Sequence, residues 1–186
     1  MNKILGKLYI TSVITYVIAA FCLSLDQATK SLIVKAFELY QSNPVFPFLN
    51  LTYVINIGAA FSIFRGQVLM LCLFAGSVSI AIVIYEMRTR DKRSKLLSFS
   101  IGFILGGALG NLIDRVRLGH VVDFLDLRHN GQNIWPIFNV ADVSINIGIG
   151  LLVLYYILQE SKTIKKDKVD EIKEENKVEA LSEENS

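Results

Sequence analysis

Two aspartates, Asp123 and Asp142, are the residues of this chain best suited to chemistry. Asp123 lies inside the apolar stretch Val121-Val122-Asp123-Phe124, and Asp142 directly precedes a long uncharged segment. Two carboxylates brought together in a partly dehydrated site cannot both ionise easily, so they tend to share one proton. The ionised member can then take a proton from water while the protonated member donates one to a carbonyl or a leaving amine. Such a pair is suited to hydrolysis, although its spacing in the sequence does not by itself establish that function.

Simpler explanations exist for several neighbouring residues. Asp142 can cap a helix, because an Asp at a helix start accepts backbone N–H groups. Asp26 and Lys30 are four residues apart, so an ordinary ion pair on a helix surface explains them as well as a function does. Three glycines recur at every fourth position, namely Gly102, Gly106 and Gly110. This stripe of small residues predicts close packing of membrane helices, whereas Asp123 has no comparable structural explanation.

Other hydrolytic chemistries find little support in the sequence. It contains no His-Glu-x-x-His zinc motif and no Gly-x-Ser-x-Gly motif. Lys30 and Ser31 are adjacent and would point to different sides of a helix, which argues against a Ser/Lys pair. Cys22 and Cys72 lie in apolar segments, where a thiol usually behaves as a small apolar side chain. We expect no disulfide, no metal and no organic cofactor.

The uncharged segments predict an integral membrane protein. Of its 186 residues, 52% are hydrophobic and the mean hydropathy is +0.45, which exceeds what the core of a soluble domain needs. The four uncharged segments are residues 8–25, 66–85, 96–113 and 143–159. Each is near the roughly 17 to 25 residues that a helix needs to cross a bilayer. We therefore predict an all-α integral membrane protein with four transmembrane helices and a small β-containing outward loop.

Lysines and arginines near the ends of these segments predict their orientation, because positively charged flanks stay in the cytoplasm. The connection between the second and third segments contains Arg88, Arg90, Lys92, Arg93 and Lys95. Lysines also precede the first segment and follow the fourth, so we expect both termini to be cytoplasmic and residues 26–65 and 114–142 to form outward loops. The acids and amides near the span ends then gather at the outer membrane face, namely Asp26, Asn111, Asp114, Asp123 and Asp142.

The first outward loop and the C-terminal tail differ sharply in composition. Residues 50–57 are rich in β-branched and aromatic residues with partial alternation, which predicts a short strand or hairpin. Aromatic side chains suited to the membrane interface occur throughout this loop, namely Phe37, Tyr40, Phe46, Phe48, Tyr53, Phe61 and Phe64. Residues 161–186 are rich in Lys and Glu and have too few apolar residues for a core. We expect a transmembrane domain at residues 1–160 and a cytoplasmic tail that is disordered or, alternatively, a lone charged helix.

Five short segments contain most of these polar residues. They are Asp26-Gln27-Ala28-Thr29-Lys30, Asn56-Ile57-Gly58-Ala59-Ala60-Phe61, Gly106-Gly107-Ala108-Leu109-Gly110-Asn111-Leu112-Ile113-Asp114-Arg115, Val121-Val122-Asp123-Phe124 and Phe138-Asn139-Val140-Ala141-Asp142. In this order the chain resembles the lipoprotein signal peptidases, also called signal peptidase II. The match spans most of residues 8–160 and, with five segments in register, is far more specific than any single segment. The charged tail lies outside it.

The resemblance implies an aspartic endopeptidase of the bacterial cytoplasmic (inner) membrane that removes the signal peptide from prolipoproteins. Cleavage would occur just before a cysteine that carries a diacylglyceryl group, with Asp123 and Asp142 as the catalytic pair. Supporting or substrate-binding roles would fall to Asn56, Asn111, Asp114, Arg115, Asn139, Asp26 and Lys30. The resemblance also implies membrane lipid as a partner and inhibition by a peptide of the globomycin type in the same cleft. We expect a monomer that binds no nucleic acid.

Two other classes of protein also place acids in membranes. A transporter or proton relay would have acids near the middle of the bilayer and broken helices in corresponding halves, and the sequence has neither pattern. A non-enzymatic membrane scaffold would keep its function after Asp123→Asn or Asp142→Asn. These two substitutions therefore separate the scaffold hypothesis from the enzyme hypothesis.

Overall fold

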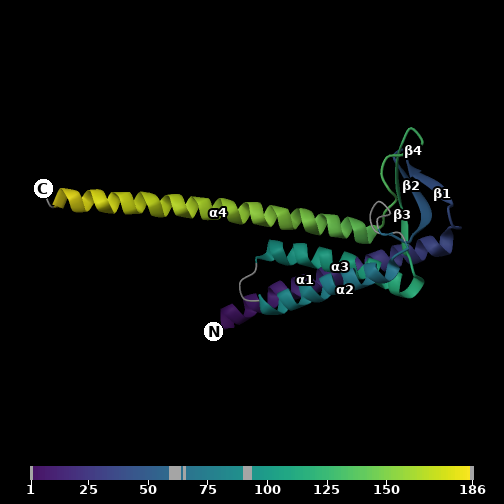
Figure 1. The fold of residues 1–186 in the computed structure, drawn as a ribbon, viewed down its shortest axis with the longest axis horizontal. Helices are drawn as coiled ribbons and strands as arrows, with labels where there is room; N and C mark the ends of the chain where they lie inside the picture. The colour runs from purple at the N-terminus through teal and green to yellow at the C-terminus, as the bar shows by residue number, and fades with distance from the viewer. Residues whose placement is uncertain (1, 59–63, 65, 90–93, 185–186) are drawn as a thin grey trace.

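The computed structural model describes residues 2–58, 64, 66–89 and 94–184, which form long helices and a small sheet (Figure 1). In chain order the elements are α1 (Asn2–Ala36), β1 (Ser42–Phe46), β2 (Leu49–Asn56), α2 (Val68–Arg88), α3 (Lys95–Leu118), β3 (Val121–His129), β4 (Gln132–Asn133) and α4 (Val140–Glu184). The central helix is α3, because it packs against each of the other three helices. The candidate site therefore has α3 as its common support.

The helices have the length and surface of membrane spans. Within the described residues, four helical segments are long and apolar enough to cross a membrane, namely Thr11–Ala36, Val68–Arg88, Lys95–Leu118 and Val140–Lys165. Large apolar side chains point outward from them, and Phe21, Leu69 and Phe74 are 63% to 74% exposed. In water such a surface would be costly, whereas lipid accepts it. The predicted fold class of four transmembrane helices with a small β-containing loop is confirmed.

Two of the helices extend beyond the predicted spans. Residues 26–36 continue α1 instead of opening the first outward loop, and α3 passes Asp114 and ends at Leu118. The prediction ended these spans at charged residues, but Asp26 and Asp114 are buried beside Lys30 in an ion cluster between the helices. Pairing lowers the cost of burying these charges, so the helices continue through them. The fourth helix begins at Val140 and, as predicted, has Asp142 near its start.

Local sequence signals set both ends of α3. The Ser94 side chain precedes the helix and accepts a hydrogen bond from Leu97 N–H, as expected of an N-cap. At the other end Gly119 has φ +75°, a left-handed conformation that glycine adopts without steric cost. Its N–H donates to Arg115 O. This turn lets β3 begin two residues later, at Val121, which brings Asp123 back over the end of α3.

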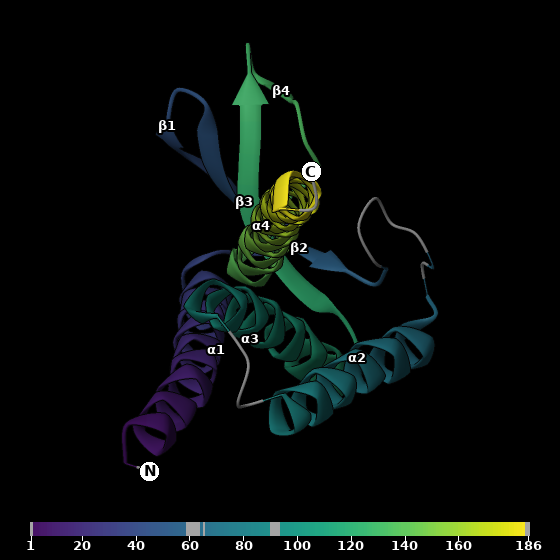
Figure 2. The ribbon, with the colours of Figure 1, turned by 90° about the vertical axis from the view of Figure 1, so that its left-hand side faces the viewer.

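The described strands form one antiparallel series in the order β1-β2-β3-β4. Strand β2 confirms the strand predicted for residues 50–57. Its pairing with β3 sets Val54 opposite Asp123 and Asn56 opposite Val121. Figures 1 and 2 show the strands gathered at the end of the bundle where α1 ends and α4 begins. The sheet therefore meets the helices where the predicted polar cluster lies.

Apolar packing fixes the sheet to this end of the bundle. Ile33 of α1 is buried against Val122 and Phe124 of β3, and Phe37 and Tyr53 pack around them. The N–H groups of Phe124 and Leu125 both donate to Phe138 O, just before α4. The middle of β3 is thus held both to α1 and to the segment that leads into α4.

The aromatic residues of the first loop divide into two groups. Phe37 and Tyr53 belong to the packed core, whereas Tyr40, Phe46, Phe48 and Phe64 are 50% to 68% exposed. The rings of Phe46 and Phe48 stack with their centroids 5.9 Å apart. Several residues named in the sequence analysis lie outside the described residues, namely Ala59, Ala60, Phe61, Arg90, Lys92 and Arg93. An interfacial role for the exposed aromatic residues stays a prediction.

The charged tail is helical in the structure, where a disordered segment was expected. Helix α4 continues through residue 160 to Glu184 and extends far beyond the other helices (Figure 1). Neither Gly nor Pro occurs after Gly150, and Lys and Glu favour helix, so nothing in the sequence ends α4 at the membrane. The alternative of a lone charged helix describes this tail better. The division into domains at residue 160 stays a prediction.

Two of the three glycines in the stripe of α3 serve close packing against α1. A Cβ at Gly102 would lie 2.7 Å from Thr15 O, and one at Gly106 would lie 2.6 Å from Ala19 O. Gly110 differs, because a Cβ there would lie 2.5 Å from Asp26 Oδ2. The first two glycines fit the predicted packing role, and the third leaves room for a buried carboxylate.

Gly106→Leu tests this packing. We expect it to destabilise the bundle by about 1–3 kcal/mol, because the added side chain must push α1 away from α3. Thermal unfolding in detergent measures the effect. Gly150→Leu on α4 is a matched control, since a Cβ at Gly150 meets no atom within 4 Å. Equal loss of stability in both variants would contradict the packing role.

Candidate active site

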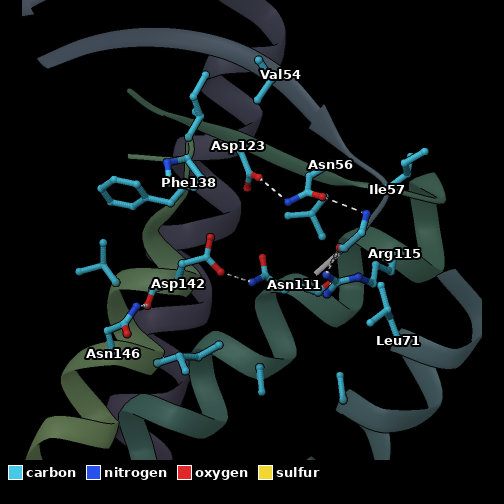
Figure 3. A pocket seen from close by; sticks show the side chains of 18 of the residues that line it. Val54, Asn56, Ile57, Leu71, Asn111, Arg115, Asp123, Phe138, Asp142 and Asn146 are labelled. Carbon is cyan, nitrogen blue, oxygen red and sulfur yellow. Dashed lines mark hydrogen bonds between the residues drawn. The ribbon is translucent and has the colours of Figure 1, made fainter. Parts of the chain in front are cut away.

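Asp123 and Asp142 converge on one cavity from different elements. Asp123 is on β3 and only 2% exposed, whereas Asp142 is in the first turn of α4 and half-buried. Both line an open cavity of about 1410 Å³ between α2, α3, α4 and the sheet. Figure 3 shows the two carboxylates pointing into it, with Asn56, Asn111 and Arg115 nearby. The structure therefore brings together the two residues that the sequence analysis singled out.

Asn139 connects the two aspartates. Its Oδ1 accepts a hydrogen bond from Asp142 N–H (3.0 Å), and its own N–H donates to Asp142 Oδ2 (3.2 Å). This reciprocal pattern is a capping box at the start of α4, with Asp in place of the more usual Glu. Asn139 Nδ2 also donates to Asp123 Oδ1 at 2.6 Å. Asp142 thus takes part in capping α4, as one interpretation predicted, although the N-cap residue is Asn139. The capping box also sets the position of Asp142 relative to Asp123.

Two further asparagines donate to the remaining carboxylate oxygens. Asn56 Nδ2 donates to Asp123 Oδ2 (2.9 Å), and Asn111 Nδ2 donates to Asp142 Oδ1 (2.8 Å). In each case another donor occupies the amide oxygen: Gly58 N–H for Asn56 and Lys30 Nζ for Asn111, both at 2.9 Å. An amide whose oxygen is already bound in this way must turn its nitrogen toward the carboxylate. The asparagines are therefore fixed as hydrogen-bond donors to the pair.

A buried ion cluster lies beneath the pair. Lys30 Nζ is 2.8 Å from Asp26 Oδ2 and 2.9 Å from Asp114 Oδ2, and all three side chains are at most 4% exposed. Gln27 Nε2 adds a 2.8 Å hydrogen bond to Asp114 Oδ1. The geometry goes beyond the simple surface ion pair considered for Asp26 and Lys30, because the pair is buried and includes an acid from α3.

Arg115 links α3 to the segment that follows β2. Its guanidinium donates to Gly58 O (2.9 Å) and to Asn111 O (3.4 Å), and it lines the cavity. Gly58 N–H in turn holds Asn56 in place. Arg115 therefore orients Asn56 indirectly, while its half-buried charge faces the same cavity as the aspartates.

Burial favours the protonated form of Asp123. Desolvation, together with the negative charge of Asp142, raises the pKa of Asp123 to about 7. The hydrogen bonds from Asn56 and Asn139 act in the opposite direction, but they only partly offset burial. Near neutral pH, Asp123 can therefore hold a proton beside a more exposed carboxylate, which is the division that acid–base chemistry needs.

Away from the aspartates the cavity is apolar. Its walls include apolar residues of three helices, namely Leu71, Phe74, Ile104, Ala108, Ile145 and Ile149. Those on α3 precede Asn111 and those on α4 follow Asp142, so the apolar part runs from the pair along the membrane-spanning segments. The cavity thus suits an apolar segment with a polar reacting group at one end.

All nine predicted site residues belong to this hydrogen-bonded assembly, but two further residues were missed. Gln27 binds Asp114, and Asn146 lines the cavity and donates to Asp142 O (2.9 Å). Both carried a signal in the sequence. Gln27 is an amide at membrane depth, and Asn146 lies one helical turn after Asp142.

Fold and site together define a membrane enzyme with a carboxylate pair at the mouth of an apolar cavity. Among solved structures, the chain is similar to a bacterial membrane enzyme with a TM-score of 0.73 and 35% identity, covering 80% of this chain and 90% of that one. The family model for signal peptidase (SPase) II matches residues 18–158. The chain belongs to the signal peptidase II family, and it is a multi-pass bacterial membrane protease.

Relatives of similar length agree with this assignment. The lipoprotein signal peptidase of Halothermothrix orenii is 42% identical over 146 residues, which cover 78% of this chain and 96% of the relative. The lipoprotein signal peptidase of Brevibacillus brevis is 45% identical over 150 residues, which cover 79% and 97%. The family resemblance noted in the sequence is therefore confirmed.

Asp142→Asn tests the interaction between the two carboxylates. We expect the pKa of Asp123 to fall below about 7 in this variant, because one of the two causes that raise it is removed. Infrared difference spectroscopy can follow the protonated carboxyl band against pH, with the band assigned by its loss in Asp123→Asn. Asp126→Asn, on the same strand but outside the cavity lining, should leave the midpoint unchanged. An unchanged midpoint in Asp142→Asn would mean that the two groups do not interact.

Proposed function

We propose that this protein is an aspartic endopeptidase that removes the signal peptide from diacylglyceryl-modified prolipoproteins by cleaving just before the lipidated cysteine. The observation that carries the proposal is the convergence of Asp123 and Asp142 on one apolar cavity. The relatives named above are lipoprotein signal peptidases, which supports the substrate class.

The pair can act on a peptide bond as follows. Asp142 takes a proton from a water molecule, whose oxygen attacks the scissile carbonyl carbon, while Asp123 donates its proton to the carbonyl oxygen. Collapse of the resulting tetrahedral diol breaks the C–N bond. Asp142 gives its newly acquired proton to the leaving nitrogen, and Asp123 recovers one from the diol. The products are a carboxylic acid and an amine, and the pair returns to its starting state.

The supporting residues have roles consistent with this reaction. Asn56, Asn111 and Asn139 orient the carboxylates through the hydrogen bonds described above. Arg115 positions Asn56 and places a positive charge beside the substrate. Asp26, Lys30 and Asp114 support the site from below. None of these steps uses a metal or an organic cofactor.

The cavity matches the proposed substrate in chemistry and position. A signal peptide presents an apolar helix, which suits the apolar walls, and its cleavage point lies near the membrane surface. In the topology predicted from the charged flanks, both termini are cytoplasmic and the pair lies near the outer face of the bacterial inner membrane. We propose a monomeric enzyme that contacts membrane lipid and is inhibited by globomycin-type peptides in this cavity.

Separate Asp123→Asn and Asp142→Asn substitutions test the catalytic pair. Each should lower cleavage of a lipidated precursor by roughly 10²–10⁴-fold, because each removes a general acid or base. Cleavage is measured with the amount of enzyme in the membrane held equal. Asp126→Asn is a suitable control, because Asp126 is buried in the same strand but bonds to Thr52 and Arg128 instead of lining the cavity. Near-normal cleavage by either active-site variant would refute the pair.

Cleavage should also decline as the pH rises through about 7. The reason is the raised pKa of Asp123: above about 7 its proton is lost, and two ionised carboxylates then lack an acid. We expect kcat/KM to fall roughly tenfold for each pH unit above this midpoint. A pH–rate profile on a substrate without groups that titrate near pH 7 measures this, and a flat profile from pH 6 to about 9 would contradict it.

A further inference from the structure

The ion cluster beneath the pair has contacts that relate it directly to the two aspartates. Asp26 Oδ1 accepts a hydrogen bond from Ala141 N–H at 2.8 Å, and Asp114 Oδ2 accepts one from Val122 N–H at 3.1 Å. Ala141 immediately precedes Asp142, and Val122 immediately precedes Asp123. Each supporting carboxylate thus holds the backbone next to one member of the pair.

Lys30 joins these two supports. Its ammonium lies 2.8 Å from Asp26 and 2.9 Å from Asp114, so one group connects the anchor of α4 to the anchor of β3. Because strands and helix starts are stiff, fixing the preceding N–H groups fixes where the two catalytic side chains begin. The separation of the pair therefore depends on the distances around Lys30.

A third contact of Lys30 affects the orientation of the Asp142 carboxylate. Its Nζ donates to Asn111 Oδ1 at 2.9 Å, and Asn111 Nδ2 donates to Asp142 Oδ1 at 2.8 Å. An ammonium has three N–H donors and no acceptor, so the three contacts match its full donor capacity. Without the ammonium, the amide of Asn111 would lose one of the donors that hold its oxygen away from Asp142.

Burial makes this arrangement rigid. Asp26 is 0% exposed, and Lys30 and Asp114 are each 3% exposed. A buried charge is tolerated only in close contact with its partners, so the cluster cannot loosen without a large loss of free energy. Gly110 leaves the space that the Asp26 carboxylate occupies, since a Cβ there would lie 2.5 Å from Asp26 Oδ2. The site thus rests on an ion cluster that has little freedom to move.

We propose that Lys30 is a positioning residue that sets the separation and orientation of Asp123 and Asp142 through Asp26, Asp114 and Asn111. The inference rests on the proposed catalytic pair, and it concerns the turnover step instead of substrate binding. Lys30 does not line the cavity, so it acts only through other residues. A role confined to holding α1 against α3 would instead affect stability and leave the turnover of folded enzyme unchanged.

The first test is Lys30→Met, which keeps most of the side-chain length and removes the ammonium. In folded enzyme we expect kcat for a diacylglyceryl-modified precursor peptide to fall by about 10- to 100-fold, because a misplacement of about 1 Å in a catalytic group has an effect of this size. KM should change by less than about threefold, because the apolar walls that bind the peptide are untouched. An unchanged kcat in folded Lys30→Met would overturn the proposal.

A double variant addresses the case in which Lys30→Met does not fold because the buried carboxylates of Asp26 and Asp114 repel each other. Lys30→Met with Asp26→Asn keeps the formal charge of the three residues at one negative, and the amide oxygen introduced by Asp26→Asn can still accept from Ala141 N–H. We expect it to fold and still to lose turnover, because the link between the two anchors is missing. Wild-type kcat in the double variant, or failure of both variants to fold, would assign Lys30 to stability alone and overturn the proposal.

Thr15→Val provides a matched control on the same helix. Thr15 is 0% exposed and donates to Ser98 O of α3 at 3.3 Å, far from the pair in sequence and outside the cavity lining. It should lower thermal stability without changing kcat. The pH profile gives a second readout, because the positive charge of Lys30 lowers the pKa of Asp123. The falling limb should move to higher pH in Lys30→Met and stay in place in Thr15→Val.

The outcomes separate this inference from the proposed function. Active Asp123→Asn or Asp142→Asn would remove the catalytic pair and, with it, any positioning role for Lys30. Inactive aspartate variants together with a fully active Lys30→Met would leave the proposed function intact and overturn only the role of Lys30.

Discussion

The candidate site depends on charges that are buried and paired between the helices. Lys30, Asp26 and Asp114 bring α1 and α3 together, and the same carboxylates accept backbone N–H groups from β3 and α4. A charge at this depth is stable only when its partners are close, so the cluster dictates how the four elements meet. The glycines of α3 make this approach possible by leaving no side chain in the way.

The two aspartates differ because they come from different kinds of element. The Asp123 side chain is buried on strand β3, where the sheet meets the helices. Asp142 lies in the first turn of α4, beside the open cavity. Burial of Asp123, with the negative charge of Asp142 beside it, raises the pKa of Asp123 and suits it to the role of proton donor in the proposed reaction. A symmetrical pair on two helices would lack this built-in difference in burial.

Much of this arrangement was predictable from the sequence, and each exception has a physical cause. Uncharged segments predicted the four helices. The charged flanks and the family motifs together predicted that Asp123, Asp142 and their polar neighbours lie close to one another. The continuation of the helices past Asp26 and Asp114 was not predicted, because a residue's charge is visible in the sequence but its buried partner is not. Gln27 was missed for the same reason, since its contact with Asp114 runs from α1 to α3. Asn146 bonds within α4, and it was missed because its place in the lining of the cavity is not visible in the sequence. The helical tail was misjudged because composition rules out a core without ruling out a helix.

The fixed direction of the three asparagine amides has an evolutionary consequence. Exchange of Asn for Asp keeps the shape of a side chain, and it is usually regarded as a mild substitution. At Asn56, Asn111 and Asn139 it would replace a donor by another negative charge facing a carboxylate. At these positions Asp, the residue closest to Asn in shape, therefore cannot serve as an intermediate on the way to another residue. A lineage that loses one of these amides must also provide a new acceptor for the N–H or ammonium group that its oxygen binds.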